Sequence, residues 1–189
     1  MKTTLVVLCI LSCSQLLSAV ETLEDAKETL ARLGIVEKHL REILESPEMW
    51  DDPNNKDTLR EALQIAGALK LDSLVPALAS HISYHYREQS KRELPVHIAF
   101  PVAGALVQMG FPAVPHLMRI LREVDVAGVG RQRALATYAL VTIYEKSGFG
   151  REMARHRIEL EIAEADEKQQ ERLRAALESP LLKDPIARE

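Results

Sequence analysis

Two histidines, His81 and His85, stand four residues apart, a spacing at which side chains share one face of a helix. Two imidazoles so placed can hold a metal ion, although zinc usually takes a third protein ligand. No Asp or Glu lies between them, and the leucines before them put His85 at the edge of an apolar stripe. We therefore expect a packed helix edge and no metal or cofactor, with His81 and His85 as weak candidate ligands.

A glycine pair, Gly128 and Gly130, precedes a predicted helix that begins near Arg131. Free N–H groups at a helix N-terminus can hold a phosphate. The pair follows a helix rather than a strand, however, and lacks the third glycine of a dinucleotide fingerprint. An inter-helix turn is the favoured interpretation. Since no other spacing indicates catalysis, we predict no catalytic residue and do not expect an enzyme.

The second half of the chain is rich in arginine and could present a basic face to an acidic partner or an anionic lipid surface. A solvated rim is the commoner role of such side chains, and it is the interpretation that we favour. The arginines are Arg119, Arg122, Arg131, Arg133, Arg151, Arg155 and Arg157. The candidate partner-binding residues are Arg119, Arg122, Arg131, Arg133 and Tyr84, since tyrosine is a good binding anchor. Tyr138 lies at helical spacing from Ala134 and Val141, and this stripe indicates that Tyr138 is a core residue.

Composition limits the class of protein. The chain has 189 residues, of which 47% are hydrophobic and 28% charged, as expected of one ordinary domain. Aromatic residues are 4%, and β-branched runs of strand length are scarce, so the composition favours helices. A net charge of -4 has the wrong sign for a protein that must neutralise phosphates, so we expect no nucleic-acid partner.

Residues 1–19 have the pattern of a secretory signal peptide. Lys2 precedes an apolar stretch from Leu5 to Leu17, and small residues follow. Cleavage would give a secreted, periplasmic or cell-envelope protein. Both cysteines, Cys9 and Cys13, lie in this segment, so a cleaved chain would have no thiol. Two alternatives stay open: a lipobox that makes Cys13 a lipid-modified N-terminus, and an uncleaved signal. A membrane is expected only in these two cases.

Two short motifs recur along the chain. Ala66-Gly67-Ala68-Leu69 returns as Ala103-Gly104-Ala105-Leu106, and a Val-Pro pair at Pro76 returns at Pro115. Fainter matches continue the series, among them Gly110-Phe111 with Gly148-Phe149. The spacings, between 34 and 39 residues, fit a repeated helix pair.

The residue pattern within each repeat predicts two helices joined by a tight turn. Pro76 falls in the first turn of a second helix, where a missing N–H costs little, and Gly110 ends a first helix. Pro101 lies inside a predicted helix and should either kink it or split it at Phe100. Residues 22–45 predict another helix pair joined at Gly34, followed by a polar linker over residues 46–56.

The segment 110–121 reads Gly-Phe-Pro-Ala-Val-Pro-His-Leu-Met-Arg-Ile-Leu. It resembles the start of a HEAT repeat, with a Pro-Ala-Val-Pro turn and a leucine-rich helix. The resemblance covers about residues 57–150 and implies an all-α fold, a short right-handed α-α superhelix of HEAT-like or armadillo type with about four helix pairs. The family consists mainly of protein-binding scaffolds. Some of its enzymes build di-iron sites on His-Glu dipeptides, and no such dipeptide occurs here.

The expected organisation follows from these patterns. Residues 1–19 are a signal peptide, 20–56 N-terminal capping helices and a linker, 57–150 HEAT-like repeats, and 151–189 a C-terminal capping helix and tail. Helices near 58–69, 95–109 and 131–146 would form one concave layer that binds a protein or peptide. The expected function is a non-enzymatic scaffold or adaptor of the cell envelope. The alternatives are a structural envelope lipoprotein and a metal-dependent enzyme using His81 and His85.

Overall fold

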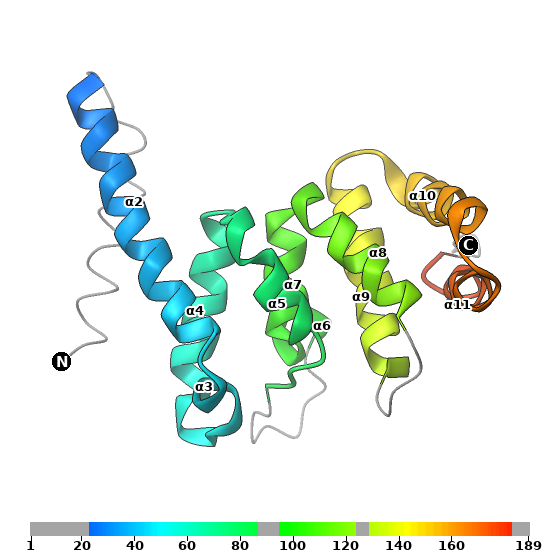
Figure 1. Ribbon diagram of the computed structural model, residues 1–189, viewed down its shortest axis with the longest axis horizontal. Coiled ribbons are helices and arrows are strands. Elements are labelled where there is room, and N and C mark those ends of the chain that lie inside the picture. Colours follow the sequence, from blue (N-terminus) through cyan, green and yellow to red (C-terminus); the bar gives the residue numbers. More distant parts are fainter. Residues whose placement is uncertain (1–22, 87–94, 124–128, 183–189) are drawn as a thin grey trace, which may run out of the picture. The chain divides into compact units, whose positions relative to one another are not determined.

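The computed structural model describes residues 23–86, 95–123 and 129–182 (Figure 1). These residues form α-helices and short 3-10 turns, and no strand occurs among them, which confirms the all-α prediction. The predicted signal segment, Cys9 and Cys13 included, lies outside this part of the chain. Of the described helices, none is both long and apolar enough to cross a membrane.

The chain divides into two compact units, Met1–Ala66 and Gly67–Glu189. The division falls inside the stretch 57–150 that the sequence predicts as one array of repeats. The first unit contains α2 (Leu23–Leu44), α3 (Pro47–Asp51), a 3-10 turn (Pro53–Asn55) and most of α4 (Lys56–Ala68).

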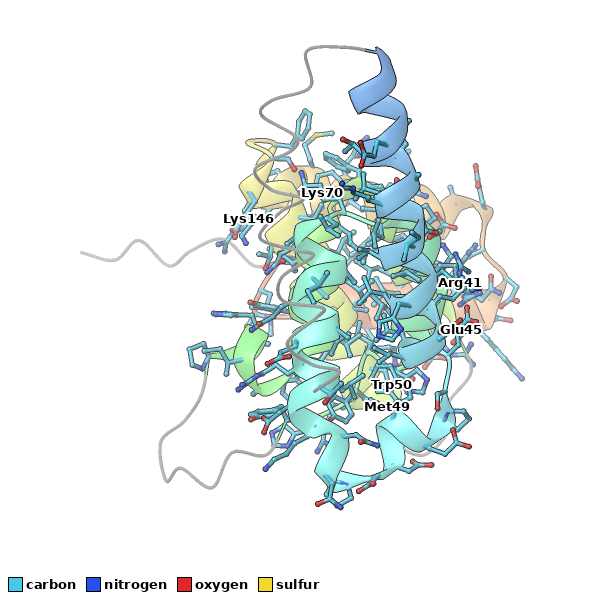
Figure 2. The ribbon with its side chains drawn as sticks, turned by 90° about the vertical axis from the view of Figure 1, so that its left-hand side faces the viewer. Arg41, Glu45, Met49, Trp50, Lys70 and Lys146 are labelled. Atoms are coloured by element: carbon cyan, nitrogen blue, oxygen red, sulfur yellow. The ribbon has the colours of Figure 1, made fainter. Side chains whose placement is uncertain are left out.

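Helix α2 runs without a break through Gly34, so the prediction of two helices joined there is wrong. One glycine costs a helix about 1 kcal/mol relative to alanine, which is too little to end it between good helix formers. Ion pairs four residues apart follow the glycine, between Glu37 and Arg41 and between Arg41 and Glu45. Figure 2 labels Arg41 in the last turn of α2 and Glu45 directly after the helix.

The predicted polar linker over residues 46–56 is instead largely helical. Pro47 begins α3 at a position where its missing N–H costs nothing. The indole Nε1 of Trp50 donates a hydrogen bond to the carbonyl of Leu44 at 2.9 Å, which ties α3 back to the end of α2 (Figure 2). The carboxylate of Asp52 accepts a hydrogen bond from the backbone N–H of Asn54 and so caps the 3-10 turn.

The second unit holds the remaining helices. They are α5 (Val75–Ser80), α6 (Val96–Ala99), α7 (Pro101–Met109), α8 (Val114–Arg122), α9 (Val129–Lys146), α10 (Gly150–Glu164) and α11 (Glu167–Leu177), with 3-10 turns at Asp72–Leu74 and Phe111–Ala113. Helix α7 packs against α5 and α9, and α8 packs against α5, α9 and α11. In this unit, α7 and α9 therefore form one layer and α5 and α8 the other (Figure 1).

Prolines define several helix starts in the second unit. Pro76 and Pro115 each lie in the first turn of a helix, as predicted. Pro101 splits its helix rather than kinking it, since α6 ends at Ala99 and Phe100 adopts φ -125° and ψ 75° between the two pieces. The residue before a proline is disfavoured in the α region, which explains why the break falls at Phe100.

The core of the second unit is aliphatic. Its fully buried side chains include Leu106 of α7, Leu117 and Leu121 of α8 and Leu140 of α9. The core assignment of Tyr138 is wrong in part: Val141 is buried, but Tyr138 is only half-buried and Ala134 is exposed. These two residues lie with Arg131 on the open face of α9.

The C-terminal region, predicted to form a single capping helix, contains two helices. Helix α10 ends at Glu164, and α11 begins with a capping box in which the Asp166 side chain accepts from the Gln169 N–H at 2.9 Å. Glu161 of α10 is 7% exposed and is held by two arginines.

Candidate binding groove

The last residues of α4, which belong to the second unit, lie near the ends of α7 and α9, and each helix ends for a local reason. After α7 and α9 the chain turns through glycines in the left-handed region, Gly110 at φ 79° and Gly148 at φ 80°. After α4 the left-handed residue is a lysine, Lys70 at φ 51°. A left-handed conformation places the Cβ of an L-residue close to a carbonyl oxygen, so glycine is the favoured residue there.

These helix ends surround a groove of about 390 Å³. All of its lining residues belong to the second unit. They are Gly67, Ala68 and Lys70 after or at the end of α4, Val107, Gln108 and Gly110 at the end of α7, and Ile143, Lys146 and Ser147 at the end of α9. The charged lining side chains are two exposed lysines, Lys70 and Lys146, which Figure 2 labels on the same side of the second unit.

The close approach of the α4 end to α7 depends on Gly67. A Cβ at Gly67 would lie 2.6 Å from Gln108 Oε1 and 3.2 Å from the Cα of Ala105. A side chain at Gly67 would require the flexible end of Gln108 to move and the backbone at Ala105 to shift slightly, so the glycine of the Ala-Gly-Ala-Leu motif allows this close approach.

Aromatic side chains stand beside the groove. Phe111 follows the lining residue Gly110, is 42% exposed, and makes edge contacts with Tyr144 at 5.3 Å and with Phe149 at 5.7 Å between ring centroids. Phe149 is 57% exposed. Tyr144 is buried, and burial raises the pKa of its hydroxyl, an effect that the nearby Arg157 guanidinium opposes. Phe111 and Phe149 thus offer apolar surface close in the chain to the lining residues Gly110 and Ser147, although neither phenylalanine lines the groove itself.

The candidate arginines do not gather into one basic face. On α8, Arg119 pairs with Glu123 at 3.3 Å, and Arg122 pairs with the buried Glu161 at 2.6 Å. On α9, Arg131 is exposed and Arg133 is half-buried. None of the four lines the groove. Much of the predicted positive charge is therefore balanced by glutamates within the chain.

The remaining arginines are paired in the same way. Arg151 contacts Glu145 at 2.8 Å, Arg155 contacts Glu159 at 3.0 Å, and Arg157 contacts Glu161 at 2.8 Å. Tyr84, the fifth candidate for partner binding, is half-buried in the turn after α5.

The two candidate metal ligands do not share a helix face, so that part of the prediction is wrong. Helix α5 ends at Ser80, His81 follows it, and His85 lies beyond a further turn, with its ring 5.0 Å from that of Phe100. Because α5 ends before either histidine, neither one lies on it. Within the described residues, no group of three or more His, Cys, Asp or Glu side chains is placed to hold a metal.

The glycine pair before α9 is placed only in part. Gly128 lies outside the described residues, and Gly130 is exposed in the first turn of α9. Among the described residues, no atom lies within 4 Å of the Cβ that Gly130 lacks.

Comparison with known proteins adds no relative: no family model matches the chain, and neither a curated protein nor a solved structure does.

Sequence reasoning missed the groove. Lys70 and Lys146 carry no motif, and the backbone conformation of Lys70 has no signature in a single sequence. One signal was available, however. The match between Gly110-Phe111 and Gly148-Phe149 indicates two equivalent turns, and both phenylalanines stand at the same edge of the unit in contact with each other.

Proposed function

We propose that this protein is a binding scaffold of the cell envelope, a short HEAT-like superhelix that holds a partner protein on the layer formed by α7 and α9. The observation that carries the proposal is the alternation of helices in the second unit between that layer and the layer of α5 and α8. Stacked helix pairs of this kind present a long surface made from equivalent helices. A location in the envelope is supported by the signal-peptide pattern of residues 1–19.

Exposed side chains on the same layer also support a binding role. The open face of α9 carries Arg131, Ala134 and the half-buried Tyr138. Tyrosine and arginine are enriched among residues that dominate binding energies at protein interfaces. Phe111 and Phe149 are also exposed, and Phe111 contacts Tyr144 near the other end of α9.

Cross-linking in the cells that make the protein tests the proposal. The native chain and two variants would be cross-linked and purified, and the bound proteins identified by mass spectrometry. Ala134→Trp adds bulk to the open face of α9, and Ala175→Trp makes the same change at an exposed position of α11. We expect one partner with the native chain and with Ala175→Trp that is lost with Ala134→Trp. Recovery of no partner, or equal recovery with both variants, would contradict the proposal.

A further inference from the structure

The groove at the ends of α4, α7 and α9 has positive charge and no negative charge in its lining. Lys70 and Lys146 are both exposed, and neither forms an ion pair with any residue that the structure describes. The arginines on α8 and α10 behave differently, since Arg119, Arg122, Arg155 and Arg157 each contact a glutamate. The groove therefore keeps two cations available for a ligand from outside the chain.

The backbone at Lys70 is a second, independent observation. Its φ of 51° lies in the region that glycine occupies after α7 and α9. A lysine is strained there, and strained backbone that persists in a fold often coincides with a functional position. The side chain of Lys70 lines the groove, so the strain holds an ammonium group where a glycine would leave none.

Apolar groups beside the lysines indicate the kind of ligand. Phe111 and Phe149 are exposed, and Met153 lies one turn beyond Phe149 and is 43% exposed. Gln108 and Ser147 add polar side chains to the lining. A free inorganic anion would use the lysines alone, whereas a peptide that combines carboxylates with apolar side chains would use both kinds of surface.

We propose that this groove binds an acidic peptide segment of a partner protein, with one or more carboxylates held between Lys70 and Lys146 and apolar side chains against Phe111 and Phe149. The proposal rests on the proposed function, because it names the part of the α7 and α9 layer that the partner contacts. Charge complementarity between two available ammonium groups and a carboxylate is its physical basis.

A purely structural explanation of the lysines makes a different prediction. Cations near helix C-termini are stabilised by the helix dipole, and Lys70 and Lys146 both follow or end a helix. That effect alone gives the lysines a role in stability and none in binding. The variant Lys70→Gly separates the two explanations, because it relieves the left-handed strain while it removes the ammonium group.

The test starts from an unbiased probe. A random-peptide display library would be selected on the full-length native chain, and the enriched peptides made with a fluorescent label. Their dissociation constants would then be measured for the native chain, Lys70→Gly, Lys146→Gln and Lys168→Gln. Lys168 is an exposed lysine in the first turn of α11, away from the groove lining, and serves as the matched control.

We expect the enriched peptides to contain Asp or Glu beside apolar residues, and their binding to weaken as salt is added. Lys70→Gly and Lys146→Gln should each raise the dissociation constant about tenfold, and Lys168→Gln should leave it unchanged. Lys70→Gly should do so while its melting temperature rises, so loss of binding could not be attributed to loss of folding.

Other results would overturn the inference. They are a library that yields no peptide, enriched peptides without an acidic bias, and equal affinities for the native chain and the two groove variants. Displacement of the peptide by inorganic phosphate or free glutamate at similar concentration would also overturn it, because the site would then be one for small anions. The scaffold proposal would survive each of these results, since the cross-linked partner tests it separately.

Discussion

Leu117 of α8 and Leu106 of α7 are core residues of the second unit. Both are fully buried, one in each helix layer. Removing most of a buried leucine side chain loses its transfer free energy and leaves a cavity between helices that can collapse only in part.

We expect Leu106→Ala or Leu117→Ala to lower the free energy of unfolding by about 2 to 5 kcal/mol. Leu160→Ala is the matched control, because Leu160 of α10 is 52% exposed and its loss should change stability by less than about 0.5 kcal/mol. Chemical denaturation of the three variants measures the differences. Equal losses at buried and exposed positions would contradict the assigned core.

Glu161 joins two parts of the second unit through charge. Its carboxylate is 2.6 Å from Arg122 Nη1 of α8 and 2.8 Å from Arg157 Nη2 of α10. The carbonyl of Arg122 in turn accepts a hydrogen bond from Arg172 of α11 at 2.9 Å. The buried carboxylate therefore links α10 to α8, and the backbone of Arg122 links α8 to α11.

Glu161→Ala should lower the free energy of unfolding by about 1 to 3 kcal/mol, because it leaves two arginines without their shared partner. The arginine side chains are about a third exposed, 35% and 36%, so water limits the loss. Glu159→Ala removes an exposed ion pair with Arg155 and should cost less than about 1 kcal/mol. Thermal and urea melts that rank the variants in the reverse order would refute the linking role.

His116 of α8 gives stability a dependence on pH. Burial, and then the charge of Arg119, lowers the pKa of His116 below its ordinary value of 6.5. The unfolded chain therefore binds a proton at this histidine before the folded chain does. The stability that neutral His116 contributes is fully present above pH 6.5 and is lost as the pH falls below that value.

We expect the native chain to lose more stability than His116→Gln as the pH is lowered from neutral through 6.5. Urea denaturation at constant ionic strength measures both curves. Parallel curves for the two proteins would show that His116 makes no such contribution.

At the residue scale, the sequence predicts buried leucines well and the groove poorly. Leu106 and Leu117 stand at helical spacing among other apolar residues, and such periodicity is a property of the sequence itself. The balancing of the arginines by glutamates could not be predicted, because the sequence does not show which glutamate each arginine contacts in the folded chain. Lys70 was missed because its conformation depends on the turn around it.

At the element scale, helix α2 shows that the low helix propensity of one residue need not end a helix. A glycine in the middle of residues 22–45 suggests a turn, yet α2 continues through it as a helix of 22 residues. The i to i+4 ion pairs on both sides add small increments that favour the continuous helix.

Gly34→Ala should therefore raise the free energy of unfolding by about 0.5 to 1 kcal/mol. Gly34 is exposed, and no described atom lies within 4 Å of its missing Cβ. Gly110→Ala is the contrasting control. It should destabilise the protein by about 1 kcal/mol or more, because φ is 79° there. A gain at Gly110 or a loss at Gly34, measured by denaturation, would contradict the assigned helix boundaries.

Helix ends that depend on local signals could be predicted from the sequence, whereas the placement of the histidine pair could not. Pro76 and Gly110 predict a helix start and a helix end correctly, because their effects on the backbone are local. His81 and His85 depend instead on how far α5 extends. Its end at Ser80 follows from the turn that leads to the buried Tyr86, whose N–H bonds to the carbonyl of Ala99 at 2.9 Å.

At the scale of the whole molecule, the repeated motifs match the observed helices only in part. The Val-Pro pair begins both α5 and α8, which contact each other. The Ala-Gly-Ala-Leu motif lies at the end of α4 and within α7, and α9, which contacts α7, does not carry it. The helix starts can be predicted from the sequence because the effect of proline on the backbone is local. Two features depend on tertiary contacts instead: the separate N-terminal unit with its long α2, and the division at Ala66.

The claim that a partner binds the α7 and α9 layer is tested most directly by a photo-cross-linking amino acid placed at single positions of the full chain in its own cells. At Ala134, on the open face of α9, we expect a cross-link to one partner. At Arg119, exposed on α8 in the other layer, we expect none. Cross-linking from Arg119 but not from Ala134 would show that the partner does not bind the α7 and α9 layer.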